Sequence, residues 1–237
     1  ANEAINIYGG ETMNKVIFYH GSAEIAQKPV LEKGKSYNDY GKGFYCTRYM
    51  ELAKEWACTE GTDGYVNEYE IDTDDLNICD LSGSEYTVLH WLALLMEHRK
   101  VDLRTPIMEK GAAWLRKNYL IDISEYDMII GYRADDSYFS FVRSFLSNEI
   151  SLKQLNYAMA LGELGKQYVL KSQKAFQHLC FVSFYPVDES IYYAKRMKRD
   201  QEARLAFRKV ILQDDIDGLY MRDMIKEEVL PNDPRLR

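Results

Sequence analysis

Short apolar runs, several of them alternating with polar residues, predict β-strands along most of the chain. The predicted strands cover residues 15–20, 44–47, 65–71, 76–81, 126–132, 166–171 and 180–184. Apolar residues at helical spacing predict helices at residues 50–58, 88–100, 106–119, 138–145, 151–159 and 172–179, with a long helix after Pro186. Strands and helices do not alternate regularly, so the pattern favours an α+β fold over a parallel α/β sheet.

The length of 237 residues allows one domain with a sizeable core. We expect an N-terminal extension over residues 1–14, a domain over residues 15–185 and a C-terminal helical extension over residues 186–237. Helical insertions at about residues 84–119 and 136–162 are expected to interrupt the domain. In the extension, apolar residues at helical spacing form a stripe that we expect to pack on the domain or on a partner protein.

The composition is that of an ordinary globular protein, since 46% of the residues are hydrophobic and 28% are charged. No apolar run is long enough to span a bilayer, so no membrane partner is expected. The formal net charge of −7 disfavours non-specific binding to nucleic acid. The four cysteines are dispersed, which disfavours a zinc site or a disulfide framework. With no signal-peptide pattern in residues 1–14, we expect a cytoplasmic protein without a metal site.

Two short segments combine residue types that suit a ligand site. Gly41 and Gly43 allow a tight turn or a close approach of the backbone to a ligand, and Tyr45 follows them on a predicted strand. Upstream, the segment His20–Ser22 comes directly after an apolar run, which places the histidine at the end of a strand. A planar aromatic ring, an imidazole and an open backbone suit a flat cationic ring attached to a ribose. The loop over residues 21–40 is expected to border this site.

The order His-Gly-Ser on a first strand and Gly-Lys-Gly-Phe-Tyr on a second resembles the signature of the ADP-ribosyltransferases of the diphtheria-toxin-like and poly(ADP-ribose)-polymerase-like groups. A narrower resemblance is to a bacterial domain-of-unknown-function family grouped with that superfamily. This resemblance extends over about residues 15–185. It is carried by residues 39–47, 56–57, 126–131, 134–136 and 167–169.

The resemblance implies a split antiparallel β-sandwich with helical insertions, in which an NAD cleft lies between two sheets. The family's catalytic triad of His, Tyr and Glu corresponds to His20, Tyr45 and Gln167. Gln167 departs from the pattern, because an uncharged amide cannot deprotonate an acceptor. We therefore expect transfer of a single ADP-ribose unit. Glu163 and Glu68 could substitute for the missing carboxylate, although a solvated position is the favoured interpretation of each.

Cleavage of the nicotinamide–ribose bond of NAD needs no general acid, because nicotinamide leaves as a neutral molecule and the transition state resembles an oxocarbenium ion. In this scheme His20 holds a ribose hydroxyl and Gly21 offers its backbone N–H and C=O to the carboxamide. Ser22 adds a hydroxyl, and Tyr45 holds the nicotinamide ring. The resemblance makes Gly43 a further NAD contact and Trp56 a second aromatic on the ring, for which a core position is the alternative.

Arg133, Asp135 and Asp136 lie in the loop after a predicted buried strand. Arg133 is a candidate contact to an NAD phosphate or to the acceptor, and a surface ion pair is the alternative. Asp135 or Asp136 can cap the helix that follows. The other interpretation is a role in the NAD site, because ligand-binding groups collect in loops at strand ends.

Four functions remain open at this point. The leading hypothesis is a mono-ADP-ribosyltransferase that uses NAD as co-substrate and modifies an unknown acceptor, as a toxin held by an antitoxin or as an effector. Water as the acceptor would make the protein an NAD glycohydrolase. Without a catalytic glutamate, the domain could also be a module that binds NAD or ADP-ribose. The fourth interpretation is a scaffold domain with no ligand.

Overall fold

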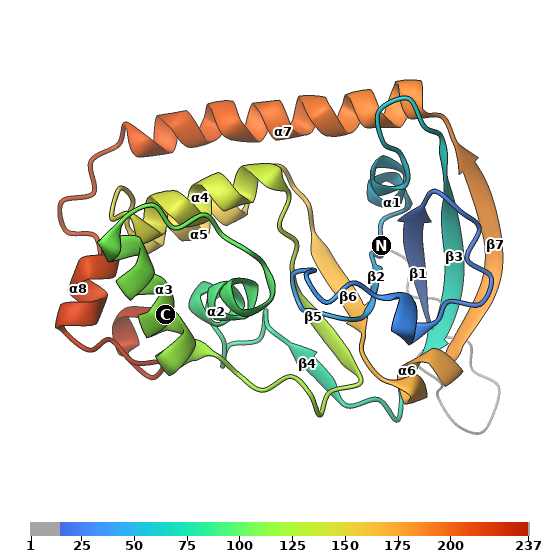
Figure 1. Ribbon diagram of the computed structural model, residues 1–237, viewed down its shortest axis with the longest axis horizontal. Coiled ribbons are helices and arrows are strands. Elements are labelled where there is room, and N and C mark those ends of the chain that lie inside the picture. Colours follow the sequence, from blue (N-terminus) through green and yellow to red (C-terminus); the bar gives the residue numbers. More distant parts are fainter. Residues whose placement is uncertain (1–14, 237) are drawn as a thin grey trace.

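The computed structural model describes residues 15–236, which form two β-sheets and a surrounding set of helices (Figure 1). The first sheet is antiparallel in the order β1-β3-β7, with β1 at Lys15–Ser22, β3 at Gly64–Asp72 and β7 at Leu179–Val187. The second sheet has the order β2-β6-β5-β4, with β2 at Phe44–Cys46, β6 at Lys166–Leu170, β5 at Met128–Tyr132 and β4 at Ile78–Asp80.

Eight α-helices occur in the described residues, and they confirm the mixed composition of strands and helices. They are α1 at Met50–Ala57, α2 at Val88–His98, α3 at Pro106–Tyr119, α4 at Asp136–Leu146, α5 at Leu152–Met159, α6 at Gln173–Gln177, α7 at Glu189–Ile211 and α8 at Met221–Lys226. Short 3-10 helices occupy Leu31–Lys33 and Pro234–Leu236.

The strand β4 runs parallel to β5, which corrects the expectation of two purely antiparallel sheets. The chain between these strands is the helical pair α2–α3, within the predicted insertion at residues 84–119. A long helical connection can return the chain to the end of the sheet where it started, so the next strand runs in the same direction. Although β3 and β4 follow each other in the chain, they lie in different sheets.

In the described part of the chain, the two sheets are joined by one β-bridge, between Tyr19 of β1 and Thr47, the residue after β2. Each residue donates its backbone N–H to the other's carbonyl oxygen, at 2.8 and 2.9 Å. Near the bridge, a small apolar cluster that includes Phe18 and Leu170 fills the space between the sheets. The Phe18 ring lies 4.7 Å from that of Tyr168, measured between centroids.

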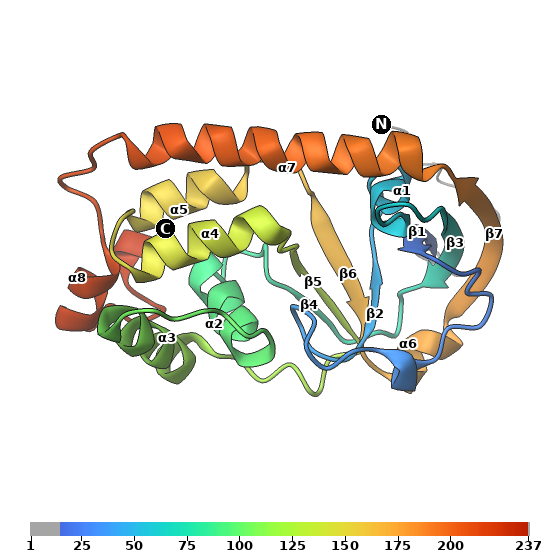
Figure 2. The same ribbon diagram turned by 45° about the horizontal axis from the view of Figure 1, so that its top comes forward.

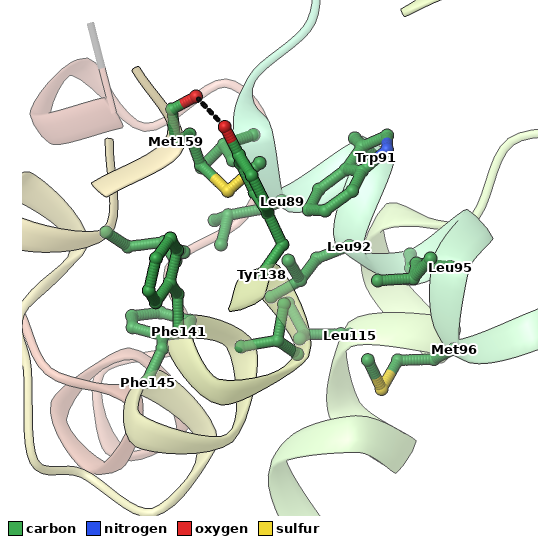
Figure 3. Packing of buried hydrophobic residues seen from close by; sticks show 14 of the residues in the cluster. Leu89, Trp91, Leu92, Leu95, Met96, Leu115, Tyr138, Phe141, Phe145 and Met159 are labelled. Atoms are coloured by element: carbon green, nitrogen blue, oxygen red, sulfur yellow. Dashed lines mark hydrogen bonds between the residues drawn. The ribbon is translucent and has the colours of Figure 1, made fainter. Parts of the chain in front are cut away.

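The main core lies on the other side of the four-stranded sheet, between that sheet and the helices. Helix α2 is buried on all sides from Val88 to Met96, as expected for a helix with almost no polar face. Figure 3 shows side chains of α2, α3 and α4 gathered in this cluster, where the Tyr138 hydroxyl donates to the Met159 carbonyl at 3.4 Å. Ile129 of the four-stranded sheet belongs to the same cluster.

The long helix α7 runs along the length of the molecule and contacts both halves (Figures 1 and 2). In its middle, Arg199 forms an ion pair with Glu55 of α1, which packs on the three-stranded sheet. Further along, Phe207 packs on Phe141 of α4, with 4.1 Å between ring centroids. The apolar stripe of the C-terminal segment therefore packs on the domain through residues of the main core.

None of the helices within residues 15–236 is long and apolar enough to cross a membrane. In the same part of the chain, no three or more His, Cys, Asp or Glu side chains form a group that could hold a metal ion.

Replacing Phe207 by alanine should lower the free energy of unfolding by about 3–5 kcal/mol, because it leaves a cavity between α7 and α4. The matched control is Leu205→Ala on the same helix, whose side chain is 49% exposed. We expect the control to change stability by less than about 0.5 kcal/mol. Urea denaturation measures both values. Equal effects of the two substitutions would contradict the placement of Phe207 in the core.

Candidate functional site

A cleft of 1130 Å³ opens between the end of β1 and the four-stranded sheet. The loop over residues 23–38, which connects β1 to the segment before β2, borders the cleft as expected. Of the residues proposed from the sequence, the cleft is lined by His20, Gly21, Ser22, Gly43, Tyr45, Trp56, Arg133 and Gln167. The fold thus brings residues from separate strands, a helix and a loop into one cavity.

The backbone of Gly21 faces this cleft. The N–H and C=O of Tyr19 form hydrogen bonds with Thr47, on the side of β1 that faces β2. Backbone groups two residues apart in a strand point in the same direction, so the N–H and C=O of Gly21 also point away from β3, into the cleft that Gly21 lines. A side chain cannot be added here, because a Cβ atom on Gly21 would lie 2.7 Å from the Ala57 nitrogen of α1.

A tight turn precedes Tyr45 and is held by its hydroxyl group. Gly41 has a φ of 71°, a conformation that glycine adopts at little cost. The Tyr45 hydroxyl donates to the Gly41 carbonyl at 2.6 Å and accepts from the Tyr40 N–H at 3.1 Å. Lys171 donates to the carbonyl oxygens of Tyr40 and Lys42 at 2.6 and 2.7 Å, and burial lowers its pKa to about 8. Tyr45 therefore lines the cleft and packs against the main core, while its hydroxyl stabilises the turn.

Gly43 lines the cleft, and its lack of a side chain also lets β2 approach β6. A Cβ atom there would lie 2.6 Å from the Cγ1 of Val169 and 2.9 Å from the Leu170 carbonyl oxygen. The second glycine of the motif is thus required by the packing of two strands.

His20 is oriented by a hydrogen bond between its Nδ1 and the Tyr45 carbonyl oxygen at 2.7 Å. Because a carbonyl can only accept, Nδ1 carries the proton, and the neutral ring keeps Nε2 as an acceptor. Burial lowers the pKa of His20 and outweighs the raising effect of this hydrogen bond. The ring packs on Phe44 at 4.3 Å between centroids. Since Nε2 has no partner among residues 15–236, it is the polar atom that His20 offers to a ligand.

Trp56 and Arg133 lie together in the cleft wall, which the sequence did not predict. The Arg133 guanidinium lies 3.5 Å from the centroid of the Trp56 ring, a cation–π contact. The same guanidinium is paired with Asp135 at 2.7 Å and is mostly buried. Arg133 thus covers one face of the indole, so that face is not open to a nicotinamide ring in this conformation.

The two aspartates after Arg133 do not line the cleft. Asp135 occupies the N-cap position of α4, but its side chain makes no capping hydrogen bond and binds Arg133 instead. Asp136 is exposed in the first turn. The prediction that either caps α4 is therefore wrong: the Ser137 N–H donates to Asp200 of α7 at 3.1 Å. A distant carboxylate replaces the local cap.

Gln167 is buried in β6, and its amide nitrogen is bound to a carboxylate. Nε2 donates to the Asp39 Oδ2 at 2.9 Å and to the Tyr132 carbonyl at 3.3 Å. Asp39 also accepts from Arg99 and from the Ala134 N–H, each at 3.0 Å. Burial raises the pKa of Asp39, against the lowering effects of Ala134, Arg99 and Gln167.

Asp39 was missed as a site residue, although it begins a segment that carries the family resemblance and lines the cleft. Its role depends on partners 60 to 128 positions away in the chain. A local sequence pattern carries no signal for such contacts.

The two glutamates considered as substitutes for the missing carboxylate lie outside the cleft. Glu163 is exposed in the turn before β6. Glu68 accepts a hydrogen bond from the Tyr185 hydroxyl at 2.6 Å. Asp39 is therefore the carboxylate that lies beside Gln167.

The charge of the cleft differs from that of the whole protein. Five basic side chains line it, Lys28, Lys33, Lys35, Arg99 and Arg133, against the two carboxylates of Glu24 and Asp39. The protein as a whole carries a net charge of −7. An excess of basic groups in a concave site raises the local concentration of anions and favours a negatively charged ligand.

A family model described as a protein of unknown function, DUF3990, matches residues 16–181, more than half of the chain. The chain belongs to the DUF3990 family. The DUF3990 match contains every residue that lines the cleft. No curated protein and no solved structure matches the chain.

We expect His20 of this DUF3990 protein to titrate below its ordinary pKa of 6.5. Between the lowered pKa and 6.5 the unfolded chain binds more protons than the folded one, so this contribution to stability is lost as the pH falls. NMR titration measures the midpoint, with the signal assigned by its loss in His20→Gln. The wild type should also lose more stability than His20→Gln between about pH 7 and pH 5. A midpoint at or above 6.5 would contradict the buried, neutral ring.

Proposed function

We propose that this protein is an NAD-dependent mono-ADP-ribosyltransferase, which cleaves the nicotinamide–ribose bond of NAD and transfers ADP-ribose to an acceptor. The proposal rests on the cleft described above and on the resemblance of its motifs to ADP-ribosyltransferases. Membership of the DUF3990 family does not by itself name a reaction.

The observation that carries the proposal is that the open backbone of Gly21 and the side chain of Tyr45 line the same cleft. The free N–H and C=O of Gly21 match the acceptor and donor of a primary carboxamide. Tyr45, in the same cleft, offers a ring held in place by its bound hydroxyl. Stacking on such a ring contributes about 0.5–1.5 kcal/mol beyond the burial of apolar surface. Nicotinamide, a flat ring with a carboxamide, fits both groups.

His20 supports the same placement of the dinucleotide. Its unpaired Nε2 can accept a hydrogen bond from a ribose hydroxyl, while Nδ1 is held by the backbone. With the ring and the ribose held, the C1′–N bond breaks, its electron pair leaves with nicotinamide, and positive charge develops on the ribose. The acceptor's nucleophile then bonds to C1′ and releases its proton to water. His20 acts here as a positioning group and transfers no proton.

The basic groups of the cleft supply counter-charges for the diphosphate of NAD. Lys28, Lys33 and Lys35 lie on the loop over residues 23–38, and Arg133 lies in the loop after β5. Arg133 retains donor groups beyond its Nε, which binds Asp135. Guanidinium groups suit phosphate oxygens because their donors match two oxygens at once.

Gln167 limits the reaction that we propose. A neutral amide cannot remove the acceptor's proton, so the acceptor must be reactive by itself or be activated by another group. Water as acceptor makes the same cleft an NAD glycohydrolase. The absence of bond cleavage would make it an NAD-binding module.

Incubation of the purified protein with NAD should release nicotinamide, measured by chromatography. His20→Ala should lower the rate about 100-fold, because the ribose is no longer held in the reactive geometry. The matched control is His178→Ala, since His178 lies outside the cleft lining and binds the Asp72 carbonyl. Nicotinamide release without a labelled acceptor would identify hydrolysis. No release, with NAD still bound in calorimetry, would support the binding module and overturn the proposal.

Two substitutions of Tyr45 separate the role of its ring from that of its hydroxyl. Tyr45→Phe keeps the ring and should retain NAD affinity within about tenfold, because a lost hydrogen bond costs about 1 kcal/mol. Tyr45→Ala removes the ring and should weaken binding further. Calorimetric titration with NAD measures both affinities, and equal loss in the two variants would mean that the hydroxyl-bound turn, and not the ring, matters.

A further inference from the structure

Asp39 and Gln167 form a buried carboxylate–amide pair in the wall of the cleft. Their side chains are joined at 2.9 Å, although the residues come from the loop before β2 and from strand β6. Both residues are almost completely buried, at 4% and 3% exposure. Both also line the cleft.

The partners of Asp39 determine which way the amide faces. Arg99, Ala134 and Gln167 all donate to Asp39. The Tyr132 carbonyl can only accept, so it holds the donor Nε2 of Gln167 on the side of Asp39. With the amide in this orientation, a proton on Asp39 would find no acceptor among Arg99, Ala134 and Gln167, so the geometry is that of an ionised carboxylate. An ionised carboxylate accepts only, and Gln167 must therefore turn its Nε2 towards Asp39.

The same arrangement leaves one atom of Gln167 for a ligand. Its two amide protons are taken by Asp39 and by the Tyr132 carbonyl. Its Oε1 has no partner among the described residues. Gln167 thus presents an acceptor to the cleft and no donor, as a carboxylate in this position would.

We propose that Asp39 is the positioning residue of this site, which holds Gln167 with Oε1 towards a ribose hydroxyl of NAD and supplies the negative charge that the ADP-ribosyltransferases it resembles carry on a glutamate. This inference rests on the proposed function for the identity of the ligand. The orientation of the amide is independent of that function.

The negative charge of Asp39 affects a ligand in the cleft through the side-chain amide of Gln167. A hydrogen bond from Nε2 to a carboxylate polarises the amide and makes its oxygen a stronger acceptor, because linked hydrogen bonds strengthen each other. The carboxylate also lies one side chain away from the ribose, where positive charge develops during bond cleavage. Arg99 and Arg133 reduce this effect, but they do not alter the direction of the amide. Asp39 is not a free base for the acceptor, since donors occupy both of its oxygens.

The pair changes what a Gln167→Glu substitution would test. The new carboxylate would lie within hydrogen-bond distance of Asp39, and two adjacent carboxylates cannot both ionise without raising the pKa of one. The single substitution therefore creates a repulsive pair. The double exchange Asp39→Asn with Gln167→Glu instead reverses the pair, so that the new amide at position 39 can donate to the new carboxylate at position 167.

The test compares the wild type, both single variants and the double exchange, by kcat and KM for NAD in nicotinamide release. Asp39→Asn and Gln167→Glu should each lower kcat about 100-fold, because the acceptor atom is displaced or the pair is repulsive. The double exchange should restore kcat to within about tenfold of the wild type. The matched control is Glu55→Gln, which removes the negative charge of the buried partner of Arg199 outside the cleft. It should lower stability without changing kcat per folded molecule.

Two outcomes of the kinetic test would overturn the inference. In the first, Asp39→Asn lowers the free energy of unfolding as Glu55→Gln does but leaves kcat and KM unchanged. In the second, the double exchange is no more active than Asp39→Asn alone.

A second measurement separates this inference from the proposed function. The side-chain amide protons of Gln167, assigned by NMR through their loss in Gln167→Glu, should exchange slowly with solvent in the wild type. They should exchange faster in Asp39→Asn and stay protected in Glu55→Gln. If the wild type releases no nicotinamide, the proposed function fails, while protection that depends on Asp39 still supports the positioning role. Unprotected protons in the wild type would overturn it whatever the activity.

Discussion

The backbone bridge between Tyr19 and Thr47 is the contact on which the cleft depends. Two hydrogen bonds join the sheets at this point, and within residues 15–236 the next residues of β1 have no paired neighbour on that side. The sheets therefore diverge from the bridge onward and leave a space with strand backbone on one wall. The bound carbonyl of Tyr45 and the open backbone of Gly21 both follow from this geometry.

The long helix α7 connects the two halves that border the cleft. It carries the ion pair between Arg199 and Glu55 on one half and the contact between Phe207 and Phe141 on the other. Asp39 makes a second connection, since it joins its loop to the end of α2, the loop after β5 and strand β6. These contacts hold polar groups of the cleft in place before a ligand arrives, which lowers the entropic cost of binding.

Local patterns were reliable where the deciding interactions are local. The alternation of bulky and polar residues at 65–71 predicted β3, and the prediction of a helix after Tyr45 matches α1. The apolar run before His20 placed this residue near the end of β1. Patterns failed where a distant residue decides the outcome. Asp200 caps α4 in place of Asp135, and no local spacing indicates that contact.

The sequence by itself determined the strands and the helices up to α7, the family resemblance, and the residues of the first two motifs, because periodicity and glycine positions depend on neighbouring residues; the helix α8 was not predicted. The tertiary structure decided the parallel pairing of β4 with β5, the cation–π contact of Arg133 with the Trp56 ring, and the position of the Asp39 carboxylate beside Gln167. The physical reason is that burial and charge pairing depend on which distant segments meet. Asp39 becomes a site residue only when α2, β5 and β6 bring donors to it.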